Sequence, residues 1–469
     1  MNKALAVTLC VAALCSGQAT AQPGRGETQF RDLFRDMVET DTSFVSGDCT
    51  ALVNKVAARM TAAGFPAKDL HIFVPPGKPK DGNLVAVLPG KDPAARAILM
   101  HGHIDVVTAL KEDWPRDPYL LVEENGQFYG RGVSDMKAQD AIWADIMLRF
   151  HQEGYRPQRG VKMALTCGEE GGGFVNGAGW LAQNQRALID AKFAITEGGG
   201  GELDADGRKV AVTVMSAEKS GASFVLEARG PGGHSSRPTD ANTIFALADA
   251  LEKLKGLTFE PSFNDANHAY FSGMAKIVGG ETGAAMTALL ANPKDPEAIA
   301  VLRRSPAYRA MLGTTCTPVL LQAGHAVNAL PNHARATINC RTLPGAPIAP
   351  IKAAITEAVA DAGVAVLGSD AAPVRQPGSA LTPDFMGPIV KVADQLYPGL
   401  PVVAMQETFG TDSGRFIAVG IPSYGFSGLF RQPDSGVIHG RNEHIGVQSV
   451  LEGREFLYRL IKTYAEARD

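Results

Sequence analysis

Three apolar, strand-like runs each carry acids or histidines toward their carboxyl ends, and this arrangement limits the folds open to the chain. The runs are AILMHGHIDVV (97–107), GVKMALTCGEE (160–170) and AKFAITEGGG (191–200). Helical patterns at 140–154 and 177–189 separate them. Continuous apolar strands alternating with helices predict an α/β fold, in which a mainly parallel sheet is sandwiched by helices.

The pattern changes after about residue 219. A strand, a helix, a β-pair, a helix and a short strand follow, at 221–233, 240–256, 317–341, 351–363 and 364–368. This order predicts a ferredoxin-like α+β domain. Residues 260–310 lack clean periodicity and are interpreted as an elaboration of that domain. The α/β pattern resumes at 373, so the expected divisions are 22–218 and 373–469 for the large domain and 219–372 for the inserted one.

The N-terminus has the features of a secretory signal. Residues 1–21 combine a lysine, an apolar stretch too short to span a bilayer, and a small-residue cleavage site before Gln22. A buried N-terminal helix is the alternative. We expect a periplasmic or secreted protein without a membrane span.

Four cysteines remain after the predicted cleavage. Cys316 and Cys340 flank the two runs of the β-pair and are candidates to face each other across it. Several pairings stay open.

Histidine and aspartate stand together at the end of the first run. His103 and Asp105 are two residues apart on a predicted strand, so their side chains share a face. An aspartate beside a histidine is the arrangement that orients a metal-bound imidazole. His101 lies on the same face and is equally consistent with a hydrogen-bonded structural residue.

Further acids and histidines lie at strand ends or in glycine-containing loops: Asp135, Glu169, Glu170, Glu197, His439 and His444. Taken singly, Asp135 is also explained as a helix cap, and the two histidines by a surface loop. Ligands of open α/β sheets bind beyond the carboxyl ends of the strands. Three strands that deliver such residues to one rim therefore favour a functional site. The net charge of −4 gives no indication of a nucleic-acid partner.

A series of motifs resembles a known family. In order they are HGHIDVV, FYGRGVSDMKA, CGEEGGG, TEGGG, GGHSSRPT, NALPNHARATINCRTLPG, GTDSGRF and HGRNEH. Together they resemble the dinuclear zinc hydrolases that include aminoacylase, carboxypeptidase S, acetylornithine deacetylase and succinyl-diaminopimelate desuccinylase. The region around 260–310 most resembles the carboxypeptidase S branch.

The resemblance implies an amide hydrolase with two Zn²⁺ per subunit, for which Co²⁺ or Mn²⁺ are possible substitutes. The implied ligands are His103 and Glu197 for one ion, Glu170 and His439 for the other, and Asp135 between them. A hydroxide bridging the ions would attack the carbonyl, with Glu169 as general base, while Asp105 supports His103. The implied substrate is a small peptide or an N-acyl amino acid, cleaved next to a free carboxylate in carboxypeptidase or aminoacylase fashion.

The resemblance also implies roles outside the metal centre. His234 would reach the site of the partner subunit in a homodimer formed through the inserted domain, and would stabilise the oxyanion there. Asn328 and Arg341 would bind the substrate and its carboxylate, and Gly410 and Thr411 would line its pocket. Without the resemblance, turns and β-pairing explain these residues as well.

Two other functions stay open: a metal-binding or peptide-binding protein without catalysis, and hydrolysis of a ureido or carbamoyl group. The complete set of inferred ligands and base argues against the first, and the similarity to carboxypeptidase S against the second. Cys167 stands where relatives often have a hydroxyl residue. We interpret it either as a redox-sensitive thiol or as a small buried residue.

Overall fold

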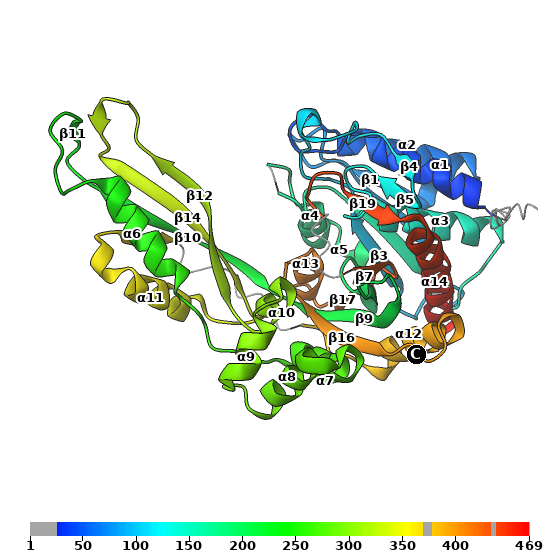
Figure 1. Ribbon diagram of the computed structural model, residues 1–469. Coiled ribbons are helices and arrows are strands. Elements are labelled where there is room, and N and C mark those ends of the chain that lie inside the picture. The colour runs from blue at the N-terminus through cyan, green and yellow to red at the C-terminus, as the bar shows by residue number, and fades with distance from the viewer. Residues whose placement is uncertain (1–25, 172, 369–377, 433–437, 469) are drawn as a thin grey trace, which may run out of the picture.

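A computed structural model describes residues 26–171, 173–368, 378–432 and 438–468. The predicted signal peptide, 1–21, lies outside these residues. The chain forms a large α/β part and an elongated smaller part that extends away from it (Figure 1).

The large part contains a ten-stranded sheet. Its order is β1 (Leu70–Phe73), β2 (Asn83–Leu88), β6 (Val161–Thr166), β3 (Ile98–His103), β7 (Phe193–Thr196), β17 (Ser423–Gly425), β9 (Lys209–Glu218), β8 (Gly200–Leu203) and β18 (Phe430–Arg431), with β16 (Val402–Glu407) paired to β9. The central strands β6, β3, β7 and β17 are parallel, whereas β1, β2 and β6 pair antiparallel. The expected mainly parallel α/β sheet is confirmed at its centre.

Helices cover both faces of this sheet, which explains the continuous apolar runs. Met100 belongs to a core on one face, and its neighbour Leu99 to a core on the other. The first face carries α1 (Glu27–Val38), α2 (Cys49–Ala62), α3 (Lys137–Gln152), α12 (Pro383–Leu396) and α14 (Val447–Glu466). The second carries α4 (Gly177–Asn184), α5 (Arg186–Ile189) and α13 (Ser413–Ile417). Strands buried on both faces have no polar side to expose.

A small three-stranded sheet lies beside α14, with the order β19 (His444–Gly446), β5 (Gln127–Tyr129) and β4 (Val122–Glu124). It joins the end of the HGRNEH motif to the segment just before Asp135. Short 3₁₀ turns complete the described elements at 67–69, 111–113 and 360–362.

The elongated part is built on a four-stranded antiparallel sheet. Its order is β12 (Thr315–Ala323), β14 (His333–Thr342), β10 (Ser220–Arg229) and β15 (Ala365–Gly368). Helices α6 (Thr243–Lys255) and α11 (Ile348–Ala358) share its hydrophobic core. The expected ferredoxin-like order of strands and helices is confirmed. A short ribbon at the tip pairs β11 (Gly233–His234) with β13 (Ala329–Leu330) (Figure 1).

The segment 260–310 differs from expectation, because it is helical and packs on the large sheet. It forms α7 (Asp265–Val278), α8 (Gly280–Ala291), α9 (Pro296–Leu302) and α10 (Pro306–Met311). Phe271 and Met274 of α7 share a core with Ala211 of β9 and Val403 of β16. Asn264, Asp295 and Ser305 each cap one of these helices. Capping residues and prolines at helix starts gave the segment the composition of a loop.

Two disulfides are present among the described residues. Cys316 and Cys340 are register partners on β12 and β14 and are bonded, which confirms the expected cross-strand pair. Cys167 is bonded to Cys49 and is buried, so the interpretation as a small buried residue is confirmed and the one as a redox-sensitive free thiol is wrong.

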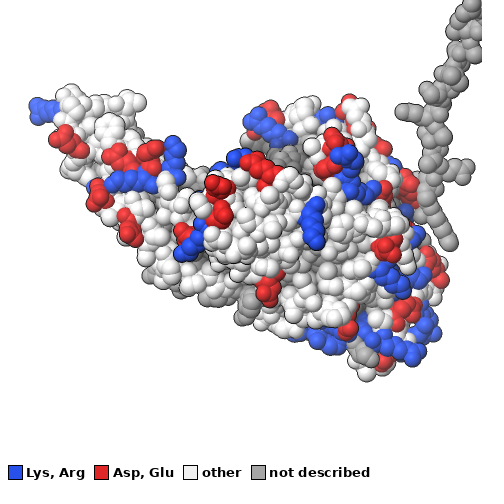
Figure 2. Space-filling view, turned by 60° about the horizontal axis from the view of Figure 1, so that its bottom comes forward, with Lys and Arg blue, Asp and Glu red and all other residues white. Residues whose placement is uncertain are grey.

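The surface carries charges of both signs. On the face shown in Figure 2, basic and acidic side chains are interspersed rather than gathered into a broad patch of one sign. No helix of the described ranges is long and apolar enough to cross a membrane.

Candidate metal centre

Three neighbouring parallel strands deliver the candidate residues to one rim of the large sheet. His103 is the last residue of β3, Glu197 follows β7, and the Glu169–Glu170 pair follows β6. Because β6, β3 and β7 are adjacent in the sheet, their carboxyl ends meet at this rim. The topology therefore brings together residues that lie up to about ninety-four positions apart in the sequence (103 to 197).

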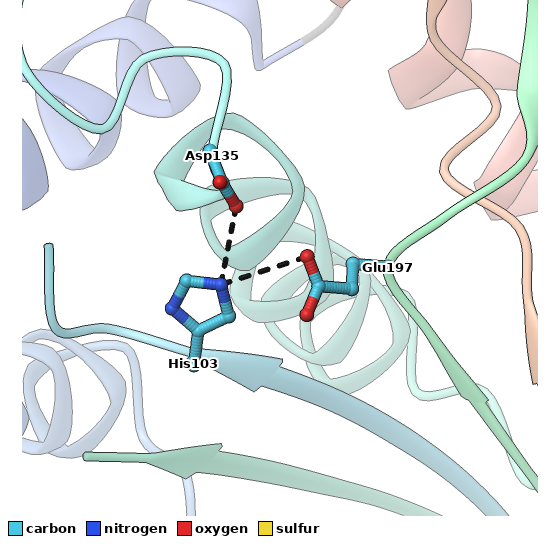
Figure 3. Close-up of side chains that lie close together, drawn as sticks. All are labelled: His103, Asp135 and Glu197. Atoms are coloured by element: carbon cyan, nitrogen blue, oxygen red, sulfur yellow. Dashed lines mark hydrogen bonds and ion pairs between the residues drawn. The ribbon is translucent and has the colours of Figure 1, made fainter. Parts of the chain in front are cut away.

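His103, Asp135 and Glu197 form the first cluster, drawn in Figure 3. His103 Nε2 lies 3.2 Å from Asp135 Oδ1 and 3.6 Å from Glu197 Oε2. The other ring nitrogen, Nδ1, lies 3.1 Å from the carbonyl oxygen of Asp105 and 3.8 Å from its carboxylate. The main-chain carbonyl thus orients this imidazole more directly than the expected aspartate side chain does.

Asp135, Glu170 and His439 form the second cluster. His439 Nε2 lies 2.8 Å from Glu170 Oε1 and 3.1 Å from Asp135 Oδ2. Asp135 therefore turns one carboxylate oxygen to each histidine. It lies two residues before α3, whose N-terminus has no side-chain cap, so the helix-cap alternative is not what the structure shows.

The electrostatics of the two clusters favour a cation. Hydrogen bonds to Asp135 and Glu170 raise the pKa of His439 to about 10. Burial lowers the pKa of His103, but Glu197 and Asp135 outweigh it and the pKa lies well above its usual value. Burial raises the pKa of Glu197 to about 7, in spite of His103. Crowded carboxylates that stabilise protonated imidazoles in this way are suited to divalent ions, since binding the ion releases those protons.

Asp105 holds the backbone of the paired glutamates. Its two carboxylate oxygens accept hydrogen bonds from the amides of Glu169 (3.3 Å) and Glu170 (3.1 Å). Glu169 itself belongs to neither cluster. Burial, followed by the charges of Glu197 and Asp412, raises its pKa to about 10. The adjacent glutamates thus occupy different environments: Glu170 contacts His439, and Glu169 lies beside the clusters.

Glu443 is a buried residue of the site that the sequence analysis missed. Its carboxylate accepts hydrogen bonds from Arg131 Nη1 (2.8 Å) and from the amides of Gly132 (3.1 Å), Ser134 (2.8 Å) and Asp135 (3.1 Å). This single anion fixes the loop that presents Asp135. The only sequence signal was its place inside the HGRNEH motif, where an acid in a polar loop resembles a solvated one.

The other candidate histidines lie outside the clusters. His101 is buried between the hydroxyls of Thr196 (3.0 Å) and Thr166 (2.9 Å), and burial lowers its pKa to about 4. It is the hydrogen-bonded structural residue of the two alternatives. His444 begins β19 and packs against Tyr129. His439 is therefore the histidine that HGRNEH supplies to the clusters.

The predicted residues of the inserted domain lie at its two ends: His234 and Asn328 at the tip, away from the metal centre of their own chain, and Arg341 at the end where the domain joins the large sheet. His234 is on β11 at the tip of the elongated part, where its Nδ1 accepts a hydrogen bond from the amide of Ser236 (3.2 Å) (Figure 1). Asn328 lies on the same ribbon, and its carbonyl accepts the amide of Ser235 (3.1 Å). Arg341 is exposed near the end of β14, opposite Gly221.

Thr411 and Gly410 lie on the loop after β16. The Thr411 amide and hydroxyl both donate to the carboxylate of Glu218, at 2.7 and 2.6 Å, and the residue is 3% exposed. Gly410 next to it is partly buried. The next residue, Asp412, accepts a hydrogen bond from Asn176 (2.7 Å) and approaches His101. Thr411 is thus held in place by Glu218, and Gly410 beside it is partly buried.

Known families and proteins are similar to this chain. The model of the peptidase family M20/M25/M40 matches residues 99–463. The N-fatty-acyl-amino acid synthase/hydrolase PM20D1 of Mus musculus is 27% identical over 80% of this chain and 76% of its own length. Aminoacylase-1A of Rattus norvegicus is 25% identical over 92% of this chain and 94% of its own length.

Solved structures share the fold at lower identity. The M20 family metallo-carboxypeptidase Sso-CP2 of Sulfolobus solfataricus has a TM-score of 0.69 at 17% identity, with 93% of this chain and 99% of that chain covered. A dinuclear metal binding peptidase of the M20 family from Bacillus subtilis, YXEP, has a TM-score of 0.54 at 12% identity, with 93% and 97% covered.

Proposed function

The chain belongs to the peptidase family M20/M25/M40, and from this premise we propose that it cleaves a peptide or N-acyl bond next to a free carboxylate with the help of two divalent metal ions. The family makes it a carboxypeptidase-like or aminoacylase-like metallohydrolase. The finer proposal depends on the position of the Asp135 carboxylate between two histidines. Its Oδ1 faces His103 (3.2 Å) and its Oδ2 faces His439 (3.1 Å).

The residues present fit two ions. His103 and Glu197 would hold one, Glu170 and His439 the other, and Asp135 would contribute one oxygen to each. Imidazole and carboxylate donors suit Zn²⁺, and Co²⁺ or Mn²⁺ as substitutes. Bound ions would polarise the scissile carbonyl and make water more acidic. The solved structure of the dinuclear metal binding peptidase is consistent with this stoichiometry.

Glu169 would be the general base. Its backbone is fixed by Asp105, and its side chain lies beside the clusters without being part of them. It would take a proton from the attacking water and pass it to the leaving nitrogen. The charges that raise its pKa come from neighbouring carboxylates, so cations at those carboxylates would offset part of the shift.

The substrate would be a small peptide or an N-acyl amino acid. The names of two relatives refer to acylated amino acids, and that of one solved structure to a carboxypeptidase. Arg341, with a planar guanidinium, is proposed to bind the free carboxylate, with Asn328, Gly410 and Thr411 around the substrate.

The site would be completed in a homodimer. His234 and Asn328 lie at the tip of the inserted domain, so they would serve the site of the partner subunit. The strand β12 is an edge strand whose Val319, Leu320 and Leu321 are exposed, and an exposed apolar edge is open to pairing with another chain. The two disulfides support an extracellular location, and with the predicted signal we propose export to the periplasm or medium.

The test combines a substrate screen with metal removal. Dipeptides and N-acyl amino acids, each with and without a free C-terminal carboxylate, are assayed with the parent, the chelated protein and Glu169→Gln. We expect chelation to abolish turnover, Zn²⁺ or Co²⁺ to restore it, and Glu169→Gln to lower kcat by about 10² to 10⁴-fold with both ions bound.

Glu123→Gln, an exposed substitution on β4, is the control and should retain parental turnover. Full activity of metal-free protein would refute the metal mechanism. Near-parental turnover of Glu169→Gln would refute the assignment of the base, and cleavage of neither substrate class by the metal-loaded parent would refute the proposed reaction.

A further inference from the structure

The disulfide Cys49–Cys167 lies directly beneath the loop that carries the paired glutamates. Cys167 follows the last residue of β6 and precedes Glu169 by two positions. Cys49 is the first residue of α2, and both cysteines are fully buried. The bond therefore connects the start of a core helix to the base of a loop of the metal centre.

The helix end that holds Cys49 is part of a rigid block. The amide of Thr50 donates to the carbonyl of Lys80 (3.1 Å), and its hydroxyl to the carbonyl of Pro79 (2.7 Å). The neighbouring Asn83 accepts the amide of Cys167 at its Oδ1 (3.0 Å). The disulfide thus adds a covalent tie where α2 and β2 already meet the end of β6.

The loop beyond Cys167 is closed at its neck. The carbonyl of Cys167 accepts the amide of Gly177 (2.7 Å). Gly168 has a φ of +90°, and a Cβ there would collide with the carbonyl of Val175, so the backbone turns sharply after the bridge. Asp105 then holds the amides of Glu169 and Glu170 from the other side. The glutamates lie between two anchors, one covalent and one hydrogen-bonded.

The second disulfide provides an internal comparison. Cys316 and Cys340 join two strands that are already paired along their length, in the inserted domain. Cys49 and Cys167 are 118 residues apart and join elements of different kinds. Removal of either disulfide removes one covalent link, but only the Cys49–Cys167 bond lies at the metal centre.

We propose that the Cys49–Cys167 bridge is a positioning device for the metal centre, which sets the place of Glu170 as ligand and of Glu169 as base. The inference rests on the proposed function. Opening the bridge should loosen the ion held by Glu170 and His439 and slow turnover, while His103 and Glu197 keep the other ion. A dithiol opens the bond by giving two electrons and two protons: the S–S bond breaks, two cysteine thiols form, and the dithiol becomes a cyclic disulfide.

The test compares two matched double variants, Cys49→Ala/Cys167→Ala and Cys316→Ala/Cys340→Ala. Binding of Co²⁺ to the metal-free proteins is titrated by absorbance, and kcat and KM are measured at saturating Co²⁺. For the first variant we expect about tenfold or greater weakening of one of the two Co²⁺ sites, as for loss of a residue that supports metal ligands. We also expect a fall in kcat of about tenfold, with KM changed less than about threefold. The second variant should match the parent in Co²⁺ affinity, kcat and KM.

The Co²⁺ titration separates this inference from the proposed function, because a protein that binds two ions and hydrolyses nothing still reports on the bridge. Parental Co²⁺ affinities in the folded first variant would overturn the proposal, as would equal losses in both double variants. Should the first variant not fold, the parent is treated with dithiothreitol, desalted and titrated, with free thiols counted by alkylation. Unchanged Co²⁺ binding with the bridge open would then overturn the proposal. Global unfolding on reduction would also overturn it, because the bond would then be a requirement for folding rather than a positioning device.

Discussion

At the scale of single residues, the most consequential group outside the metal clusters is Glu443. It satisfies three backbone amides and Arg131 at once, and it lies with Arg131 in a buried ion pair. Such a pair stabilises little as a whole, but removal of one partner leaves a buried charge uncompensated. Both the fold and the place of Asp135 therefore depend on it.

Glu443→Gln should weaken stability and metal binding together. The amide has one acceptor oxygen and no charge to oppose Arg131, so we expect the free energy of unfolding to fall by about 3 kcal/mol. Co²⁺ affinity should fall by about 10 to 100-fold as the Asp135 loop relaxes. Urea unfolding and a Co²⁺ titration measure the two effects. Glu281→Gln, which alters an exposed ion pair on α8, should change neither, and a parental Co²⁺ affinity in Glu443→Gln would contradict the role of this residue.

The sequence predicted the residues that form the two clusters, because each follows a strand or lies in a short motif. It could not predict Glu443, whose burial arises only when the segment at 439–444 folds over the loop at 131–135. Nor could it predict that Thr411 would bind Glu218, since the two are 193 positions apart. Contacts between distant loops leave no periodic signal in a single sequence.

At the scale of elements, α7 is attached to the large sheet by a titratable contact. The hydroxyl of Tyr270 donates to Glu202 Oε1 of β8 at 3.1 Å. Burial raises the pKa of Glu202 from 4.5 to about 7; the hydrogen bond from Tyr270 opposes this shift and the charge of Glu407 adds to it. The folded protein therefore holds a proton here at pH values where the unfolded chain has released it.

Glu202 should make stability depend on pH. Because its folded pKa is raised, its contribution is complete below pH 4.5 and is lost as the pH rises through about 7. Glu202→Gln keeps an acceptor for Tyr270 without a charge, so we expect the variant to gain about 1 to 2 kcal/mol relative to the parent at pH 8, and less at pH 5. Urea unfolding at several pH values measures this. Parallel pH profiles for parent and variant would contradict it.

The elements themselves were predictable where apolar residues formed a continuous run, as in β3, β6 and β7, or a helical pattern, as in α3. The helices α7 to α10 were not, because their cores are completed by β9 and β16 rather than by their own neighbours in sequence. Gly273 illustrates the difficulty: it looks like a helix breaker, yet a Cβ there would lie 2.8 Å from Val403, so glycine permits close packing.

At the scale of the whole molecule, the inserted domain holds His234 and Asn328 at its tip, far from the metal centre of the same chain. Its sheet has two edges, β12 and β15, with exposed apolar side chains on both. Leu320 on β12 is 63% exposed, and Leu367 on β15 is 43% exposed. In the proposed homodimer, β12 is the edge that pairs with the partner subunit, and β15 is not.

Leu320→Arg should separate the proposed dimer, because a charge on the pairing edge opposes association. We expect a monomer by light scattering, a loss of turnover and an unchanged Co²⁺ content. Leu367→Arg, on the opposite edge, is the matched control and should remain a dimer.

Mixing His234→Ala with Glu169→Gln should restore activity in hybrid dimers. A fully active Leu320→Arg monomer, or hybrids without activity, would remove the support for catalysis across subunits.

The path of the chain between its two parts has a consequence for how such a protein can evolve. The chain leaves the large sheet at β10, returns for α7 to α10, and leaves again for β12, with Lys219 donating to the carbonyls of Ala310 (2.8 Å) and Gly313 (2.6 Å). The inserted domain is therefore not one continuous segment of the chain. A recombination that removed everything between its outer ends would also remove α7 to α10, which bury Ala211 and Val403 of the large sheet. An exchange of this domain between relatives must keep the helical segment and replace only what lies on either side of it.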